Sequence, residues 1–360
     1  MKKLFVMAAL VGVALTGCMK NEVYVPTCDT PISFEVANYE AQTRANGAFA
    51  YDSFGVNAWS RDAAASESVL MMDGVTVSEA NDKWTTTTPY YWPINGTVDF
   101  IAYYPTTVKP TIEYKYDGTD TYTYPTYTVG NVDLMYADKA VRFSANTAAD
   151  DNESDFGFGT GAYGFEGVPT LFHHALAKVN FNVQNAYPAE TANSNITYEI
   201  VVDNITLSTY NTGTVTLTNN RTTTPASRGA WSVANNVWTT SGSLATLTWE
   251  EDDDAITVLA DDSVVPYAER IQYVLPQTLS DNVTVSVTYT VSQKQKGTPI
   301  SVKQYTPAAI KLNTMGLTSW EMNKNITYTI SIIAKSNQIL FAPAVEEWST
   351  DDANGAVTIQ

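Results

Sequence analysis

The sequence predicts an all-β protein built from antiparallel β-sandwiches, and two observations lead to this fold class. The first is a period of two in hydrophobicity. In residues 283–291, four valines and a tyrosine alternate with serine and threonine, as in a strand with one buried and one exposed face. The second is the number of such runs, since shorter alternating runs recur at 179–183, 205–207, 215–217 and 326–330. Helical periodicity is scarce, and residues 63–72 fit either a short helix or a loop.

Turn residues separate these predicted strands. Asn, Gly and Pro residues, which are typical of turns, occur at 211–213, 219–220 and 297–299. We expect the first of these turns to divide the runs at 205–207 and 215–217 into two strands. Many short strands rich in β-branched and aromatic residues, with frequent turns between them, indicate sandwiches.

The chain length favours about two domains. An acidic and then glycine-rich stretch at 150–163 is the best candidate for a linker or an exposed loop. It predicts an N-terminal sandwich at 45–165 and a C-terminal sandwich at 166–336. A single large sandwich, with this stretch as an insertion, is the alternative that periodicity leaves open.

The first 18 residues predict an export signal followed by a lipid attachment site. Lys2 and Lys3 precede an apolar run at 4–16, and small residues then lead to Cys18. As a helix the apolar run reaches roughly 20 Å, whereas the hydrocarbon core of a bilayer is about 30 Å thick. We therefore interpret residues 1–17 as a signal peptide and Cys18 as the lipidated N-terminus of an exported protein, rather than as a buried helix.

Composition excludes several classes of protein. With 44% hydrophobic and 16% charged residues, the chain is expected to fold. Its formal net charge of −18 repels phosphate backbones, so nucleic acid is not an expected partner. Of the two cysteines, Cys18 is assigned to lipid and Cys28 has no remaining partner, so the sequence predicts no disulfide framework.

Residues that could carry catalysis or bind a metal are scarce. His173 and His174 are neighbours on a predicted strand, so they point to opposite faces and cannot chelate one metal together; we expect one packed and one exposed imidazole. The acidic clusters at 150–153 and 250–254 fit solvated charge better than the paired carboxylates of a glycosidase, although the second could hold a surface calcium ion. Neither a nucleophile elbow nor a phosphate-binding glycine loop occurs. We expect no enzyme, no catalytic residue, no metal site and no cofactor.

The chain is rich in aromatic residues, with 22 tyrosines and 8 tryptophans. This favours two interpretations, because tyrosine rings can stack on sugars and can also form packed ladders across strands. A spacing of two favours the ladder. The densest group of tyrosines is Tyr114, Tyr116, Tyr122, Tyr124 and Tyr127.

Two terminal segments have complementary patterns. Residues 31–36 predict one strand with Ile32, Phe34 and Val36 on one side. A polar stretch around Arg44 follows, and it is either open to a trypsin-like protease or a simple connector. At the other end, residues 338–348 and 355–360 are extended and apolar. Such a strand can form the edge of its own sheet or can complete the sheet of another subunit.

Taken in order, these features resemble the Bacteroidales fimbrillins, which are type V pilin subunits, and their fimbrillin-like relatives. The resemblance covers nearly the whole chain, and it depends on the joint presence of several motifs in this order. The motifs are the lipobox with its trailing strand and arginine, Trp84 with residues 90–93, and residues 98–105, 133–137, 172–179, 273–277 and 341–345 with Trp348.

The resemblance implies two transthyretin-like sandwiches in tandem and an outer-membrane lipoprotein precursor. It implies that residues 18–44 form a lipidated propeptide, which an arginine-specific protease removes by cutting between Arg44 and Ala45. Before the cut, Ile32, Phe34 and Val36 would fill a groove, and Cys28 would leave with the propeptide. The mature subunit would then join an extracellular fimbria.

The resemblance also implies donor-strand exchange, in which residues 337–360 of one subunit fill the groove of the next. The expected partners are other fimbrial subunits, including anchor and tip proteins, the outer membrane through the lipid, and a host or bacterial surface ligand. Stalk, anchor and tip positions stay open, although Arg44 and the long tail lean towards a stalk subunit. The alternatives are a tip adhesin or a glycan-binding surface lipoprotein that does not polymerise. The candidate groove-filling residues are Ile339, Phe341, Val345, Val357 and Ile359.

Overall fold

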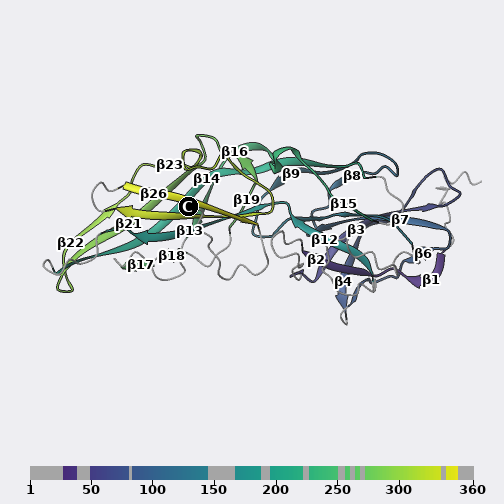
Figure 1. Cartoon of the computed structure of the whole chain (residues 1–360), viewed down its shortest axis with the longest axis horizontal. Helices are drawn as coiled ribbons and strands as arrows, with labels where there is room; N and C mark the ends of the chain where they lie inside the picture. The colour runs from purple at the N-terminus through teal and green to yellow at the C-terminus, as the bar shows by residue number, and fades with distance from the viewer. Residues whose placement is uncertain are drawn as a thin grey trace, which may run out of the picture.

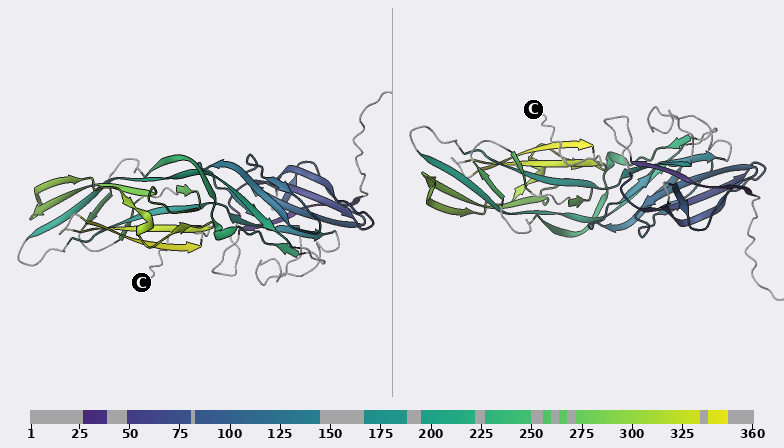
Figure 2. Two further views of the ribbon diagram at one scale, coloured as in Figure 1. Left: turned by 90° about the horizontal axis from the view of Figure 1, so that it is seen from above. Right: turned by 90° about the horizontal axis from the view of Figure 1, so that it is seen from below.

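The computed structural model describes residues 27–38, 49–80, 83–144, 167–187, 195–221, 227–249, 256–259, 264–267, 272–333 and 338–347. In these residues the chain forms β-strands and two 3₁₀ helices, η3 (Ala234–Asn236) and η4 (Leu312–Thr314). The molecule is elongated, with the first half of the chain at one end and most of the second half at the other (Figures 1 and 2). The all-β prediction is therefore confirmed.

A nine-stranded sheet dominates the N-terminal end, with the strand order β10-β12-β2-β5-β4-β3-β7-β11-β15. β10 also pairs with β7, so the path of paired strands from β10 to β7 closes on itself. β1 (Thr27–Pro31) and β6 (Tyr91–Pro93) form a separate pair. The strands of the nine-stranded sheet are β2 (Phe34–Asn38), β3 (Ser53–Asp62), β4 (Val69–Ala80), β5 (Lys83–Thr86), β7 (Gly96–Tyr104), β10 (Met135–Ala137), β11 (Lys139–Phe143), β12 (Val168–His174) and β15 (Ser227–Gly229).

Two further sheets build the C-terminal end. The eight-stranded sheet contains β8 (Thr111–Glu113), β9 (Asp120–Thr128), β14 (Ile196–Asn219), β16 (Thr239–Trp249), β17 (Ile256–Leu259), β21 (Thr284–Gln295), β22 (Thr298–Tyr305) and β23 (Ile310–Lys311). The five-stranded sheet contains β13 (Ala177–Asn185), β18 (Val264–Pro266), β19 (Gln272–Val274), β25 (Lys324–Ile333) and β26 (Gln338–Glu347). A short pair, β20 (Gln277–Thr278) and β24 (Ser319–Trp320), completes the described strands.

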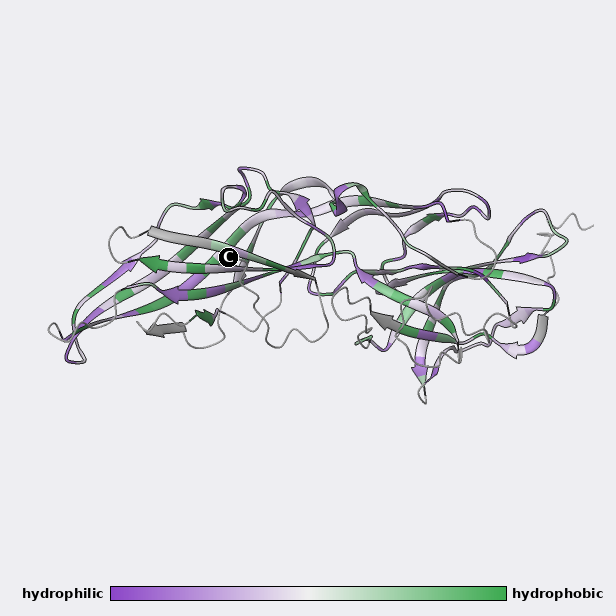
Figure 3. Cartoon of the chain, in the orientation of Figure 1, coloured by the Kyte–Doolittle hydropathy of each residue, from purple (hydrophilic) through white to green (hydrophobic). Residues whose placement is uncertain are grey.

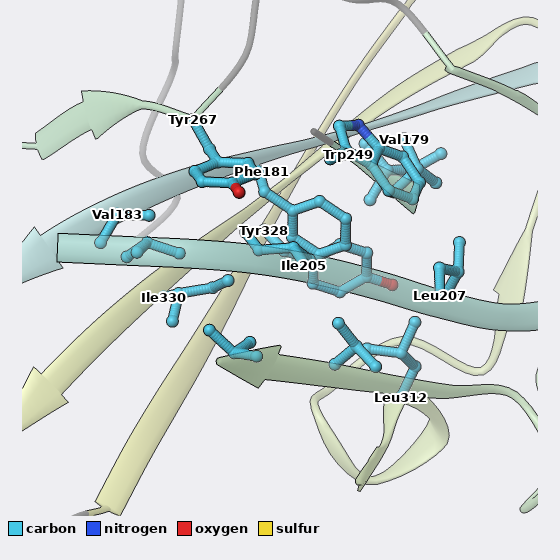
Figure 4. Packing of buried hydrophobic residues seen from close by; sticks show 14 of the residues in the cluster. Val179, Phe181, Val183, Ile205, Leu207, Trp249, Tyr267, Leu312, Tyr328 and Ile330 are labelled. Carbon is cyan, nitrogen blue, oxygen red and sulfur yellow. The ribbon is translucent and has the colours of Figure 1, made fainter. Parts of the chain in front are cut away.

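The C-terminal core lies where the eight- and five-stranded sheets contribute alternate residues to one apolar cluster (Figure 4). Val179, Phe181 and Val183 come from β13, and Ile330 comes from β25. On β21, Val285, Val287, Tyr289 and Val291 are buried, as their period of two predicts. The same alternation of apolar and polar residues is visible along the strands in Figure 3.

Two further apolar clusters meet at β7. The N-terminal core takes Val98, Phe100 and Ala102, whereas a middle core takes Ile101 and Tyr103 from the opposite face of the same strand. Because β7 is covered on both faces, its second half from Phe100 to Tyr104 is apolar at every position instead of alternating. The middle core also contains residues of β9 and of the C-terminal part of β14, so it joins the two ends of the molecule.

The turn predicted at residues 211–213 is wrong, because this stretch lies inside β14 and the runs at 205–207 and 215–217 are one strand. β14 shifts register against β16 near Thr212 and against β9 near Val215, so bulges absorb the irregular residues. A Cβ on Gly213 would lie 2.7 Å from the Thr239 carbonyl oxygen. The glycine therefore marks a close backbone approach and not a turn. By contrast, a turn does separate β21 and β22 next to the predicted 297–299, but it lies at Lys296 and Gly297, which both have positive φ, and Thr298 already begins β22.

Two other local predictions change. Residues 31–36 are not one strand, because β1 ends at Pro31 and β2 begins at Phe34. Between them the chain passes from pairing with β6 to pairing with β12. Residues 63–72 form a turn followed by the start of β4.

Strands from the two halves of the sequence pair with each other. β12 pairs with β2 and β10, while β14 pairs with β9 and β15 pairs with β11. The division at 165/166 and the transthyretin-like resemblance stay predictions. The stretch at 150–163 lies outside the described residues.

Candidate functional site

The N-terminal segment fills an interior position of the nine-stranded sheet. β2 lies between β12 and β5, parallel to the first and antiparallel to the second, and β2 and β12 run side by side in Figure 1. Five residues of β2 are in register with β12, from Phe34 opposite Val168 to Asn38 opposite Phe172. On the other side Phe34 pairs with Trp84. The sheet therefore depends on this segment for continuity between β12 and β5.

Side chains of the segment belong to the N-terminal core. Ile32 is 2% exposed and Phe34 is 4% exposed, and Val36 packs half-buried against the same cluster. The Phe34 ring makes edge contacts with Phe54 and Phe100, with ring centroids 5.8 and 5.6 Å apart. Burying an apolar side chain of this size contributes roughly 1.5–3 kcal/mol. Ile32 and Phe34 are thus core residues of the molecule as described.

The backbone around β2 is held closely. The Ile32 N–H donates to the Tyr90 carbonyl at 2.7 Å, and the Val168 N–H donates to the Ser33 carbonyl at 2.7 Å. A Cβ built on Gly167 would lie 2.5 Å from the carbonyl carbon of Phe34, so only glycine permits this approach without displacement. Gly167 therefore permits the close approach of the β2 backbone to the start of β12.

Phe49 is the first described residue after β2, and its side chain packs beside the same site. Its ring stacks on Phe172 with centroids 4.6 Å apart and makes edge contacts with Phe54 and Trp84. These three side chains also border the position of β2. Phe49 is thus anchored beside the position of β2.

β26, the predicted donor segment, occupies a different kind of position. It is an edge strand of the five-stranded sheet and pairs with β25 over ten positions, from Lys324 opposite Glu347 to Ile333 opposite Gln338. Val345 is half-buried against the C-terminal core. Ile339 and Phe341 have defined register, opposite Ile332 and Ile330, but their side chains lie outside the described part.

Several predicted site residues fall outside the described residues. They are the lipidation residue Cys18, the cleavage pair Arg44 and Ala45, and the tail residues Val357 and Ile359. The acidic clusters at 150–153 and 250–254 fall outside as well. In the part of the chain that the structure covers, no helix is long and apolar enough to cross a bilayer. Over the same part, no group of three or more His, Cys, Asp or Glu residues converges as metal ligands would.

The two histidines reach different aspartates from β12. His174 is buried, with Nδ1 2.6 Å from Asp133 Oδ2, whereas the half-buried His173 places Nε2 3.0 Å from Asp138 Oδ1. Their separate partners agree with the expectation of opposite faces, but the expected exposed imidazole is wrong, because His173 is half-buried and stacks on Tyr136. Tyr51 donates to Asp133 Oδ2 at 3.3 Å, and burial, with Asp133 adding to it, raises the pKa of Tyr51. These hydrogen bonds indicate that the two histidines and Tyr51 have structural roles.

The tyrosine group is largely engaged inside the protein. Tyr122 and Tyr124 are buried in the middle core, as the ladder interpretation predicts. Tyr116 has the guanidinium groups of Arg61 and Arg142 over its ring, 3.9 and 4.1 Å from the centroid. These contacts occupy ring surfaces that a stacked sugar would need.

Sequence reasoning missed the side of the site that receives β2. Periodicity does not connect residues 34–38 with β12 or Gly167, because both are far away in the sequence. Phe49 is closer to β2, but it has no hydrophobic pattern around it. The available signal was a glycine directly before an apolar strand, which often marks a close backbone approach. Pairing between distant strands has no comparable local signal.

The fold and the site define an all-β protein in which an N-terminal strand completes a sheet otherwise built by later residues. The family model described as fimbrillin-like matches residues 43–348, and the chain belongs to this family. The match begins after β2 and includes β26 up to its last residue.

One solved structure agrees with the fold, and two others match with lower TM-scores. A fimbrial protein from Bacteroides vulgatus superposes with a TM-score of 0.56 at 18% identity, covering 89% of this chain and 99% of that one. A candidate cell adhesion protein from Bacteroides uniformis has a TM-score of 0.40 at 15% identity, with coverages of 89% and 99%. Another from Bacteroides ovatus has a TM-score of 0.42 at 12% identity, with coverages of 90% and 99%. No curated protein matches the chain in sequence.

Proposed function

We propose that the protein is a structural, non-enzymatic subunit of a cell-surface fimbria with a role in adhesion, and that it polymerises by donor-strand exchange. It is made as a lipoprotein precursor anchored to the outer membrane through Cys18, and an arginine-specific protease cuts it between Arg44 and Ala45. One observation carries the proposal. An interior strand of the sheet, β2, comes from a segment that the family model leaves out.

Removal of β2 would leave a vacancy that only another strand can fill. The backbone N–H and C=O groups of β12 that pair with β2 would lose their partner, and the apolar residues that pack against Ile32 and Phe34 would face water. A strand that enters this position restores the main-chain hydrogen bonds and fills the pockets with alternate side chains. The propeptide therefore acts as a placeholder that keeps the precursor monomeric.

The C-terminal segment is the proposed donor, with Ile339, Phe341, Val345, Val357 and Ile359 as groove-filling residues. The visible part of this segment, β26, is paired on one side only. β2 lies in one half of the elongated molecule and β26 in the other (Figure 1). A donor in one half and an acceptor in the other form a head-to-tail contact, which repeats into an open filament instead of closing into a dimer.

This arrangement fits a stalk position, in which one subunit both accepts and donates a strand. Neighbouring copies, together with anchor and tip proteins, are the proposed partners, and a host or bacterial surface ligand is the proposed target of adhesion. Fimbrial and cell adhesion proteins among the structural neighbours agree with this role.

Limited digestion of the purified precursor with a trypsin-like protease tests the proposal. We expect a new N-terminus at Ala45, followed by ladders of multimers that resist SDS. An Arg44→Ala precursor is the control and should stay uncut at this position and monomeric. If the wild-type protein is cut at Arg44, loses residues 18–44 and stays strictly monomeric, the proposal fails.

A further inference from the structure

A lysine and two aspartates meet in the interior, away from the β2 site. Lys139, the first residue of β11, places Nζ 2.7 Å from Asp120 Oδ2 and 3.1 Å from Asp99 Oδ2. All three side chains are at most 1% exposed. Asp99 lies on β7 in the nine-stranded sheet, whereas Asp120 begins β9 in the eight-stranded sheet. The cluster therefore bridges two sheets beside the middle core.

The charges of this cluster do not balance. Two carboxylates face one ammonium group in a site without water access, and an uncompensated buried charge is strongly unfavourable. Taking up one proton removes the excess charge. Burial raises the pKa of Asp120, although the neighbouring Lys139 opposes this effect. A neutral Asp120 carboxyl next to an amine is a pair of groups that can condense.

Other contacts fix both carboxyl groups for this reaction. The Lys115 N–H donates to Asp120 Oδ1 at 2.6 Å, which polarises the carboxyl carbon. Asp99 accepts from the Tyr114 hydroxyl at 3.1 Å and from the Arg142 N–H at 2.7 Å. Arg142 has a φ of 62° within the irregular part of β11, and this local bulge directs its N–H to Asp99.

An aromatic cover excludes water from the amine. The Tyr114 ring lies over Lys139, with Nζ 4.7 Å from the ring centroid. Trp59 stacks on the same tyrosine with centroids 4.4 Å apart and an interplanar angle of 5°. A dry site favours amide formation, because water is the product and because the ionic form loses its solvation.

We propose that Lys139 Nζ and the Asp120 carboxyl group condense into an intramolecular amide, with Asp99 as the group that carries protons. Asp99 takes a proton from the ammonium group, and the freed lone pair forms a bond to Cγ of neutral Asp120. The carboxyl C–O bond then breaks, and its hydroxyl leaves as water with the proton that Asp99 returns. The nitrogen gives a second proton to Asp99, which ends neutral. One N–C bond replaces one C–O bond, and nothing is oxidised or reduced.

The chain contains a matched pair that should not react. Lys311 Nζ lies 2.7 Å from Asp281 Oδ2, the same separation as in the buried pair, but these side chains are 50% and 68% exposed. Hydrogen bonds from Lys311 and Asn313 lower the pKa of Asp281, so this carboxyl group stays charged. Solvent access and a charged carboxylate leave Lys311 and Asp281 as an ordinary ion pair.

Peptide mapping of the purified full chain tests the proposal directly. Trypsin should cut after Lys115 and Arg142 but not after Lys139, and it should release peptide 116–142 lighter than its sequence by the mass of one water molecule. Chymotrypsin cleavage between residues 120 and 139 should leave the two pieces joined. In the same digest trypsin should cut after Lys311.

Two variants distinguish the loss of the Lys139–Asp120 amide from the loss of the fold. Lys139→Arg keeps a positive charge without a nucleophilic amine, so trypsin should cut after position 139. Asp99→Asn should leave Lys139 uncoupled and cleavable. Peptide 116–139 from the wild-type protein at its full sequence mass would overturn the proposal, as would a bond from Lys139 to Asp99.

Discussion

β2 and β26 are the first and last strands of their sheets in sequence, yet they are held in different ways. β2 is an interior strand with neighbours on both sides, and the adjoining Ile32 and its own Phe34 are buried. β26 has a longer run of pairs, but on one side only, and Ala342 is exposed. The two positions have different requirements. An interior position must stay filled, whereas an edge strand can leave without opening its sheet.

This difference gives each strand a separate role in the proposed exchange. A covalent cut can make β2 removable, because after the cut only non-covalent contacts hold β2 in the sheet. β26 needs no cut, because one-sided pairing can be replaced by two-sided pairing in the next subunit. The comparison therefore predicts effects that depend on which strand is altered and on whether cleavage has occurred.

The largest expected effect comes from locking β26 to its own sheet. Thr329 and Ala342 are directly opposite on β25 and β26. A disulfide between Thr329→Cys and Ala342→Cys, with Cys28→Ser, should permit cleavage at Arg44 but abolish SDS-resistant ladders. Reduction should restore the ladders, and the Ala342→Cys single variant should polymerise normally. Equal ladders from the oxidised and reduced double variant would show that β26 does not need to leave β25.

A smaller effect is expected from shortening a core side chain of β2. Phe34→Ala should lower the unfolding free energy of the precursor by about 3–5 kcal/mol, because it leaves a cavity among Phe54 and Phe100. After cleavage and exchange the variant and the wild type have the same sequence, so their polymers should be equally stable. Thermal unfolding before and after protease treatment measures both. A difference that persists in the polymer would mean that β2 is retained.

The smallest effect is expected at Gly167, which faces the backbone of β2 rather than a side chain. Gly167→Ala should destabilise the precursor by about 1–3 kcal/mol, because its Cβ would overlap the backbone of Phe34. Urea unfolding of the intact precursor gives this value. Gly130→Ala is a suitable control, since a Cβ there would meet no atom within 4 Å. Equal losses at both positions would argue against a close seating of β2.

Local patterns predicted the strands well, whereas distant pairings were beyond them. The alternation in 283–291 predicted the buried face of β21, and the alternation in 31–36 placed Ile32 and Phe34 on one side, where both are buried. Nothing near β2 indicates that it runs parallel to β12, because that pairing joins residues far apart in the chain. At 211–213, residues that usually form turns are carried through β14 by bulges and a close backbone contact.

The buried charges show the same limit. Asp99 lies between Val98 and Phe100 in β7, Lys139 begins β11, and Asp120 follows a loop. Composition alone assigns such residues to the surface. Only the packing of two sheets brings both carboxylates within 3.1 Å of the Lys139 amine.

The N-terminal sequence of subunits recovered from assembled surface fibres tests the central claim most directly. If β2 is a placeholder, these subunits begin at Ala45 and lack Ile32, Phe34 and the lipid on Cys18. An N-terminus at Cys18 in subunits that are joined to one another would contradict the account, because β2 would then still occupy its place in the sheet.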